Sequence, residues 1–330
     1  MRRHSLVIAT VAAAALALSA CSSTPEPAPS ASTDGTASGA FPVTVETKFE
    51  PVTIDEQPIR IVALGWGDAE TALALGAQPV GASDWLGFGG EGVGPWAEGL
   101  YDEAPEIIPT LEPDFEQIAA LEPDLILDTK GSGDQERYER LSSIAPTIGV
   151  PEGGDSYLTS TVQQMTMIAA ALGVPERGEE LLAEVDAAFA DAAEAHPDWA
   201  GRSATAATRT SEGWGAYVAE SERVQFLERL GFEQSPTIAD IAPDASGFTV
   251  SVSSEQLDLL DSDLIVAFPI FIETTEITDD PQWQAIPAVA DGRAVVIDGD
   301  VSSAYSLGTT LATEYALEQV VPRIEEALGS

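Results

Sequence analysis

The sequence contains few of the residues that most often carry catalysis or bind a structural metal. Its 330 residues include two histidines and one cysteine. A serine or cysteine nucleophile needs an oriented histidine base, and zinc sites usually draw on cysteine or histidine. A single cysteine also excludes an intramolecular disulfide framework. His196 stands beside Pro197 at the end of a predicted helix, where a helix-end cation is the simplest interpretation. The composition therefore argues against a catalytic nucleophile with a histidine base and against a zinc site.

Positive charge is also scarce. Fourteen Lys and Arg stand against 55 Asp and Glu, which gives a formal net charge of −41. Such a surface repels nucleic-acid phosphates, so we expect no nucleic-acid partner. We interpret the acidic excess as a contribution to solubility, with an acidic docking surface as the alternative. No glycine-rich phosphate loop or dinucleotide fingerprint occurs, and carboxylates are too abundant to single out an acid/base pair.

The N-terminus has the features of a secretory leader. Two arginines precede an apolar run over residues 6–18 that is too short to span a bilayer comfortably, so residues 1–20 are predicted to be a signal peptide. The leader ends in LSAC, which resembles the lipobox of bacterial lipoproteins and makes Cys21 the expected lipidation site; a lone structural thiol is the competing interpretation. Residues 21–40 are then the lipidated cysteine and a flexible tether rich in Ser, Thr, Pro and Ala.

One phrase occurs twice. FEQIAALEPDLILD at residues 115–128 returns as SEQLDLLDSDLIVA at residues 254–267. Each copy predicts a helix opened by a capping box, with Asp114 or Ser253 as N-cap, followed by a buried parallel strand. The copies are too far apart for a solenoid repeat, so the pattern favours two similar α/β lobes. The alternative is that any α/β protein contains such helix-to-strand units.

The rest of the chain fits this division. We expect an N-terminal lobe over residues 41–155, a helical segment over residues 156–200 and a C-terminal lobe over residues 201–330. Helical spacing predicts helices over residues 156–172 and 175–196. The second of these would measure about 30 Å, enough to run the height of both lobes.

Strands and further helices are expected within each lobe. The predicted strands cover residues 59–64, 79–82, 147–150, 204–208 and 294–297, besides the two in the repeats. The predicted helices are one capped by Asp68, one over residues 135–144, one capped by Ser221 and a closing helix over residues 306–328.

Aromatic and cationic residues recur just after the predicted strands. Ligands of open α/β sheets bind beyond the carboxyl ends of the strands, so two facing lobes would gather these residues around a shared cleft. A loop rich in Gly and Trp over residues 84–99 is unusually long for a connection. Any single candidate is more often a packing residue than a ligand contact. The candidate ligand-binding residues are Trp66, Trp85, Lys130, Arg209, Trp214, Tyr217, Phe268 and, beginning the closing helix, Tyr305.

The sequence resembles the helical-backbone substrate-binding lipoproteins of bacterial ABC importers, in the iron-siderophore branch that is related to cobalamin- and haem-binding members. The resemblance extends over nearly all of residues 50–325. It rests on the order and spacing of RIVAL at 60–64, ALALGAQPVG at 72–81, IAALEPDLIL at 118–127, FLERLGF at 226–232 and SSEQL at 253–257.

The resemblance implies a fold, a location and partners. The expected fold is α/β, with two similar α/β lobes joined by a single long backbone helix and a ligand cleft between them. The expected protein is a monomer anchored to the outer face of the bacterial cytoplasmic membrane, where it delivers a ferric chelate to an ABC permease and its ATPase. Family members engage the permease through one Glu on each lobe, which here match Glu116 and Glu255. Capping of a helix dipole is the alternative role for these carboxylates.

The resemblance also bears on the ligand. Members that bind tri-anionic catecholate complexes carry several cleft arginines. This chain offers Lys130 and Arg223 near two such positions, but Gly247 and Phe248 stand where a further Arg would be. We therefore expect a neutral or weakly anionic ferric siderophore of the hydroxamate or mixed-ligand type, which itself holds the iron, with no cofactor and no protein-bound metal.

Arg209 is the cation that we expect to hold the iron-bound oxygens, because a guanidinium presents several donors in a rigid fork. A structural salt bridge to Glu212 is the alternative role for Arg209. Two other functions remain open at this point: a haem or cobalamin receptor of the same fold, and a secreted lipoprotein hydrolase. The shortage of histidine disfavours the hydrolase, so we expect a binding protein and not an enzyme.

Overall fold

The computed structural model describes residues 41–245 and 247–329. The predicted signal peptide, Cys21 and the tether lie outside these residues. Within the described residues no helix combines the length and apolar character needed to cross a membrane.

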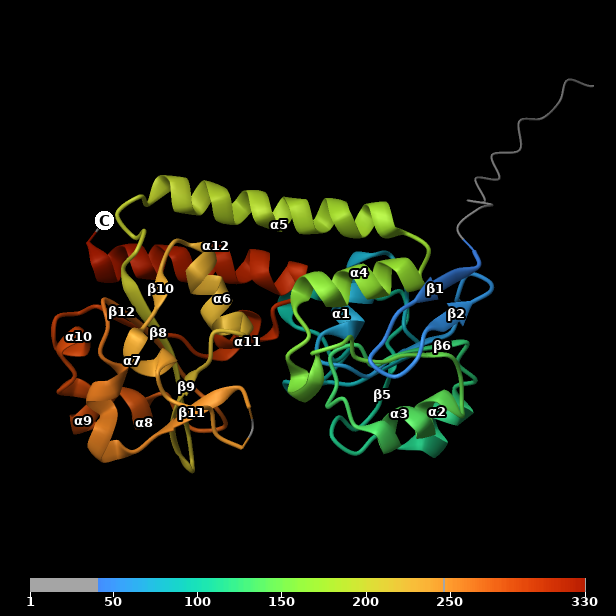
Figure 1. Ribbon diagram of the computed structural model, residues 1–330, viewed down its shortest axis with the longest axis horizontal. Coiled ribbons are helices and arrows are strands. Elements are labelled where there is room, and N and C mark those ends of the chain that lie inside the picture. Colours follow the sequence, from blue (N-terminus) through green and yellow to red (C-terminus); the bar gives the residue numbers. More distant parts are fainter. Residues whose placement is uncertain (1–40, 246, 330) are drawn as a thin grey trace, which may run out of the picture. The chain divides into compact units, whose positions relative to one another are not determined.

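The N-terminal lobe is built on a five-stranded, all-parallel sheet in the order β5-β4-β3-β6-β7 (Figure 1). Its strands are short, and the apolar runs that form β3 and β6 are buried on both faces, as expected for covered parallel strands. The strands are β3 (Ile61–Ala63), β4 (Gly81–Ala82), β5 (Glu106–Ile107), β6 (Leu125–Leu127) and β7 (Thr147–Ile148). The helices are α1 (Asp68–Ala74), η1 (Pro95–Ala97), α2 (Phe115–Ala120), α3 (Gln135–Ser142) and η2 (Asp155–Tyr157). An antiparallel hairpin of β1 (Val43–Val45) and β2 (Val52–Ile54) precedes the sheet.

The C-terminal lobe has a mixed sheet with longer strands, in the order β11-β9-β8-β12-β13, with β10 beside the start of β8. β12 lies between β8 and β13 as β6 lies between β3 and β7, so the two copies of the repeat occupy equivalent places. The strands are β8 (Ser203–Thr210), β9 (Gly213–Tyr217), β10 (Glu233–Gln234), β11 (Thr249–Val252), β12 (Leu264–Pro269) and β13 (Ala294–Val296). The helices are α6 (Glu222–Arg229), α7 (Pro236–Ala239), η3 (Ser254–Leu260), α8 (Thr275–Thr278), α9 (Pro281–Gln284), α10 (Pro287–Ala290), α11 (Gly299–Leu307) and α12 (Thr310–Leu328).

One long helix connects the lobes. α4 (Thr161–Ala171) packs its buried residues into the N-terminal core, and α5 (Pro175–Ala195) follows it. Along α5, Leu181 belongs to the N-terminal core, whereas Val185 and Phe189 belong to the C-terminal core. Figure 1 shows α5 lying beside α12 and extending over both lobes. The predicted two-lobed α/β fold with a single long backbone helix is confirmed.

Several local predictions need correction. Asp114 caps α2 by accepting from the N–H groups of Glu116 and Gln117, but the Gln117 side chain donates to Ile107 and closes no capping box. In the second copy, Ser253 makes no capping bond to the backbone, and the segment is a 3₁₀ helix (η3). Asp68 was expected to cap α1, yet Gly67 is the cap residue there.

The closing helix is also divided. Gly308 adopts φ 71° between α11 and α12, and Thr309 caps α12 through the N–H of Ala312. Tyr305 therefore lies inside α11 and not at the start of a long closing helix. The helix predicted over residues 156–172 begins later, at Thr161, because Ser156 and Tyr157 have positive φ and Ser160 forms a capping box with Gln163.

Candidate functional site

The loops that follow β3 and β6 are joined by one buried carboxylate. Asp68 is fully buried and accepts hydrogen bonds from Gly65 N at 3.0 Å, Thr129 N at 3.0 Å, Thr129 Oγ1 at 2.5 Å and Gln164 Nε2 at 2.7 Å. Burial raises the pKa of Asp68 to about 6, against the opposing effect of these donors. Trp66, in the loop after β3, donates its backbone N–H to the carbonyl of Lys130. Asp68 thus fixes two candidate ligand-binding residues relative to each other and to α4.

A second buried carboxylate, Asp128, fixes the loop that follows β6. Asp128 accepts two parallel hydrogen bonds from Arg137, at 2.9 Å from Nε and 2.8 Å from Nη2. Burial raises the pKa of Asp128, while Arg137 opposes that shift. A Cβ on Gly131 would lie 2.8 Å from Asp128 Oδ1, so the loop needs glycine at this position. The pair fixes the backbone from which Lys130 projects.

Seven of the nine candidate ligand-binding residues form one connected cluster between the lobes. Trp66 and Trp85 are 5.7 Å apart between ring centroids. The Arg223 guanidinium lies 5.7 Å from the Trp66 ring and 4.8 Å from the Tyr217 ring, so it bridges the two lobes. Phe268 lies 5.8 Å from Tyr217 and 6.2 Å from Tyr305 between ring centroids. Tyr305 Oη donates a 2.5 Å hydrogen bond to the carbonyl of Arg223.

Lys130 joins this cluster through Glu222. Lys130 is 3% exposed, and its Nζ lies 3.5 Å from Glu222 Oε1. Burial lowers the pKa of Lys130, while the charge of Glu222 opposes that shift. Arg223 also acts on Lys130 as a like charge. Two cations from different lobes therefore lie together, beside one carboxylate.

Arg209 and Trp214 lie apart from this cluster. The Arg209 guanidinium lies 5.9 Å from the Trp214 ring. Among the described residues it has no ring contact with the seven residues of the interlobe cluster. Arg209 donates to the carbonyl of Thr210 and forms no ion pair within residues 41–245 and 247–329, so no salt bridge to Glu212 is present. Its Nε is buried without a partner. Trp214 is 3% exposed and stacks on Trp283 at 5.2 Å in the C-terminal core.

The structure corrects the assumption that all these residues follow strands. Trp66, Trp85 and Lys130 do follow strands, whereas Arg209, Trp214, Tyr217 and Phe268 lie within β8, β9 and β12. Tyr217, Phe268 and Tyr305 are buried, so they support the cluster from the C-terminal core. Trp66, Trp85, Arg209 and Arg223 are the candidates that remain partly exposed.

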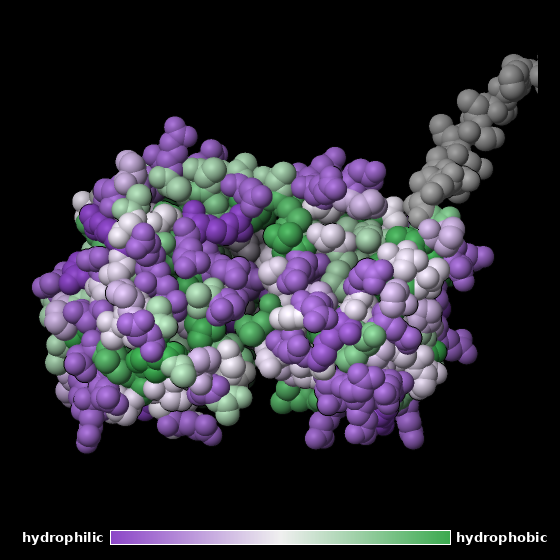
Figure 2. Space-filling model, in the orientation of Figure 1, coloured by the Kyte–Doolittle hydropathy of each residue, from purple (hydrophilic) through white to green (hydrophobic). Residues whose placement is uncertain are grey.

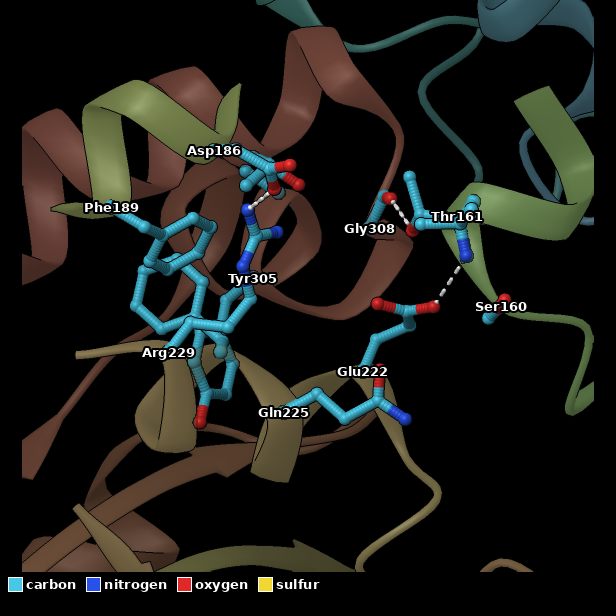
Figure 3. Close-up of a pocket in the computed structure, with 13 residues that line it drawn as sticks. Ser160, Thr161, Asp186, Phe189, Glu222, Gln225, Arg229, Tyr305 and Gly308 are labelled. Carbon is cyan, nitrogen blue, oxygen red and sulfur yellow. Dashed lines mark hydrogen bonds and ion pairs between the residues drawn. The ribbon is translucent and has the colours of Figure 1, made fainter. Parts of the chain in front are cut away.

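A cavity of about 150 Å³ lies on the helical side of this cluster, between α4, α5, α6, α11 and α12. Figure 3 shows its polar lining: Arg229 pairs with Asp186 on one side, and Glu222 accepts from the Thr161 N–H at 2.9 Å on the other. Tyr305 is the candidate ligand-binding residue that lines it. Figure 2 shows a further indentation between the two lobes on a face that is otherwise largely hydrophilic.

Several contributors were absent from the sequence prediction. Tyr157 contacts Trp85 edge to face at 5.3 Å, from a backbone of positive φ. Trp96, in the long Gly-rich loop, lies 5.3 Å from Tyr315 of the other lobe and donates to the buried carboxylate of Glu70 at 2.8 Å. Glu70 also accepts from Thr309, at 2.8 Å, and burial raises its pKa. The two tryptophans of the loop could have indicated its contact with the other lobe. Nothing in the sequence indicated that Glu70 would be buried.

The family assignment follows from comparison with known proteins. The model of the periplasmic binding protein family matches residues 61–301, which is most of the chain. The chain belongs to this family. Periplasmic binding proteins bind solutes and are not a family of enzymes, and substrate-binding proteins of this kind work with a membrane permease. No group of three or more His, Cys, Asp or Glu suited to a metal ion occurs among the described residues.

Individual relatives agree with the assignment. The chain is 26% identical to the probable siderophore-binding lipoprotein YfiY of Bacillus subtilis, over 97% of this chain and 98% of the relative. A periplasmic solute binding protein of Mycobacterium smegmatis superposes with a TM-score of 0.74 at 26% identity, over 87% of this chain and 99% of the other. PiaA of Streptococcus pneumoniae in complex with ferrichrome superposes with a TM-score of 0.73 at 24% identity, with the same coverage.

Proposed function

We propose that this periplasmic binding protein captures a ferric siderophore outside the cytoplasmic membrane and delivers it to the permease of an ABC importer. The observation that carries the proposal is the interlobe cluster, in which the rings of Trp66 and Tyr217 lie near the Arg223 guanidinium and Trp85 packs beside Trp66. Aromatic rings and a partly desolvated cation suit a bulky chelate with polar, iron-bound oxygens. The name of the Bacillus relative and the ferrichrome bound to PiaA support the same class of ligand.

The proposed ligand is a hydroxamate or mixed-ligand complex. Arg223, Lys130 and Arg209 are the proposed cations, and Trp66 and Trp85 are the proposed ring contacts. The buried Tyr217, Phe268, Trp214 and Tyr305 would hold these residues in place. Because the siderophore itself provides the ligands of iron, the protein needs only to recognise the outer surface of the complex.

Tryptophan emission offers a direct test. Ferrichrome, haem and cobalamin are titrated separately against the full chain in detergent, with native mass spectrometry to establish stoichiometry. We expect ferrichrome to quench the fluorescence, because Trp66 and Trp85 would adjoin the iron complex, and to raise the melting temperature. Binding of haem or cobalamin without ferrichrome would replace the proposed ligand, and no response to any of the three would contradict the proposal.

Docking to the permease is proposed to use Glu116 and Glu255. Both side chains are exposed, and the helices that carry them precede the equivalent strands β6 and β12. Rim charges mainly govern association and register. The double change Glu116→Ala and Glu255→Ala should abolish uptake of iron complexes by cells while the purified protein keeps its affinity for ferrichrome. Normal uptake by the double variant would exclude this role.

Membrane attachment is proposed to occur through Cys21, since the lipobox would supply a diacylglyceryl thioether and stable anchoring takes more than one acyl chain. Cys21→Ala should move the protein from the membrane fraction to the soluble fraction. Retention of this variant in membranes that have been washed with high salt would show that another segment provides the anchor.

A further inference from the structure

The cations of the interlobe cluster are matched by carboxylates. Lys130 is acted on electrostatically by Glu222, Arg223 and Asp68. The neighbouring Asp128 and Arg137 form their own ion pair and add no net charge. With all groups in their ordinary ionised forms, the two cations Lys130 and Arg223 therefore balance the two carboxylates Glu222 and Asp68.

Of the two carboxylates, Glu222 belongs to the C-terminal lobe and reaches the cluster from α6. Its Oε1 accepts the N–H of Thr161, the first residue of α4, at 2.9 Å and lies 3.5 Å from Lys130 Nζ. The N-terminus of an eleven-residue helix stabilises an ionised carboxylate. Glu222 thus sits at the boundary between the lobes, beside the N-terminus of α4.

Backbone packing leaves Glu222 little freedom to move away. Gly308 lies against the side chain, where an added Cβ would stand 2.9 Å from Glu222 Cγ. The carbonyl of Gly308 accepts from the Thr161 hydroxyl, which ties the same three segments together. Figure 3 shows Glu222 facing Thr161 and Gly308 at one end of the cavity. A fixed carboxylate next to the proposed binding cations repels any ligand oxygen with full negative charge.

We propose that Glu222 determines the charge specificity of the site: by neutralising Lys130 it admits uncharged ferric chelates and rejects strongly anionic ones. This inference rests on the proposed siderophore function and adds the residue that sets the ligand's charge. Specificity of this kind comes from a repulsive group as much as from attractive ones. Arg223 supplies the attraction, since its Nε is buried without a partner and its guanidinium lies between two rings.

The test compares ferrichrome, a neutral tris-hydroxamate complex, with a ferric tris-catecholate that carries three negative charges. Both are titrated against the full chain in detergent by tryptophan quenching at low salt. The unaltered protein should prefer ferrichrome. Glu222→Gln should bind the tris-catecholate about tenfold more tightly or better, with ferrichrome affinity changed less than about twofold, because the glutamine oxygen still accepts from Thr161.

Matched variants separate charge from shape. Glu220→Gln removes the same charge from an exposed position two residues away and should leave both affinities unchanged. The double variant Glu222→Gln with Lys130→Gln restores the charge balance and should lose the gain for the tris-catecholate. If Glu222→Gln unfolds, Lys130→Gln alone serves as the test, because it removes a positive charge from the same group. Lys130→Gln should weaken tris-catecholate binding more than ferrichrome binding.

The outcomes are distinguishable. If ferrichrome binds but Glu222→Gln leaves the preference unchanged, or the unaltered protein binds both complexes equally, the role of Glu222 is overturned and the siderophore function stands. A gain that persists in the double variant would assign the effect to shape and also overturn the proposal. Absence of binding by either complex to every variant would overturn the siderophore function together with this inference.

Discussion

The two lobes share a topology around their central strands but are stabilised by different chemistry. The N-terminal lobe buries charged groups, namely Asp68, Glu70, Asp128 and Lys130, whereas the buried polar residues described after residue 200 are all Ser or Thr. The C-terminal lobe instead buries aromatic rings, which are Trp214, Tyr217, Phe226, Phe232, Phe268, Trp283 and Tyr305, with Trp199 beside them.

This difference follows the needs of the site. The strands of the N-terminal sheet have two or three residues, so Trp66 and Lys130 lie beyond strand pairing, in the loops that follow β3 and β6. Hydrogen bonds to fixed carboxylates are directional and set the positions of those loops. In the C-terminal lobe, β8 and β12 are eight and six residues long and already position their side chains. Apolar burial, which has no direction, is then sufficient to stabilise that lobe.

The largest effect is expected from removing an aromatic ring of the C-terminal core. Trp283→Ala should lower the free energy of unfolding by about 3 to 5 kcal/mol, because Trp283 is 2% exposed and loses its stack on Trp214. Urea denaturation measures the change, and Trp283→Phe should recover a substantial part of it. A loss below about 1 kcal/mol would show that this lobe does not depend on its rings.

The corresponding test in the N-terminal lobe is one of pH. Burial raises the pKa of Asp68 from its ordinary value of 3.8 to about 6 in the folded protein, so between these values the folded state binds more protons than the unfolded state. The contribution of Asp68 to the free energy of unfolding therefore falls as pH rises from about 4 to 6, by about 3 kcal/mol in total.

Asp68→Asn removes this titration but leaves four donors facing an amide that has one acceptor oxygen. The variant should be less stable than the parent, and the difference between the two should be largest near pH 4 and shrink towards pH 7. Parallel urea titrations of both proteins at several pH values measure that difference. The contributions of the many other carboxylates to the pH dependence cancel, because both proteins contain them. A difference that grows with pH would mean that the hydrogen bonds outweigh burial and that the pKa of Asp68 is depressed.

The same contrast explains which parts of the site were predictable. The apolar runs of the repeat predicted β6 and β12 because a covered parallel strand leaves that pattern in the sequence. Trp214 was placed among the ligand contacts because the turn between β8 and β9 was not recognised; along β9, alternate residues face opposite sides, so Trp214 points into one core and Tyr217 towards another. The pairings of Asp68 with Gln164 and of Lys130 with Glu222 join residues distant in sequence and leave no local signal.

Ligand affinity gives a third comparison, between a cation that bridges the lobes and one that belongs to the C-terminal sheet. Arg223→Ala and Arg209→Ala should each weaken ferrichrome binding about ten- to a hundredfold, the equivalent of losing a charge-assisted hydrogen bond to the ligand. Arg209→Ala should leave the melting temperature of the unliganded protein nearly unchanged, since Arg209 forms no ion pair among the described residues. Unchanged affinity with a lower melting temperature would assign Arg209 to the scaffold and leave Arg223 and Lys130 as the binding cations.

The smallest effect is expected at the two proposed docking carboxylates. Glu116 lies in the first turn of α2, whose N-terminus Asp114 already caps, and Glu255 lies in a 3₁₀ segment with no capping bond from Ser253. An exposed carboxylate near a helix N-terminus contributes about 0.3 kcal/mol or somewhat more, so Glu116→Gln should lower the melting temperature by about 1 °C and Glu255→Gln by less. Differential scanning calorimetry of the unliganded variants checks this order. A loss above about 1 kcal/mol in either variant would give that carboxylate a structural role, and any uptake defect of the variant would then no longer report docking alone.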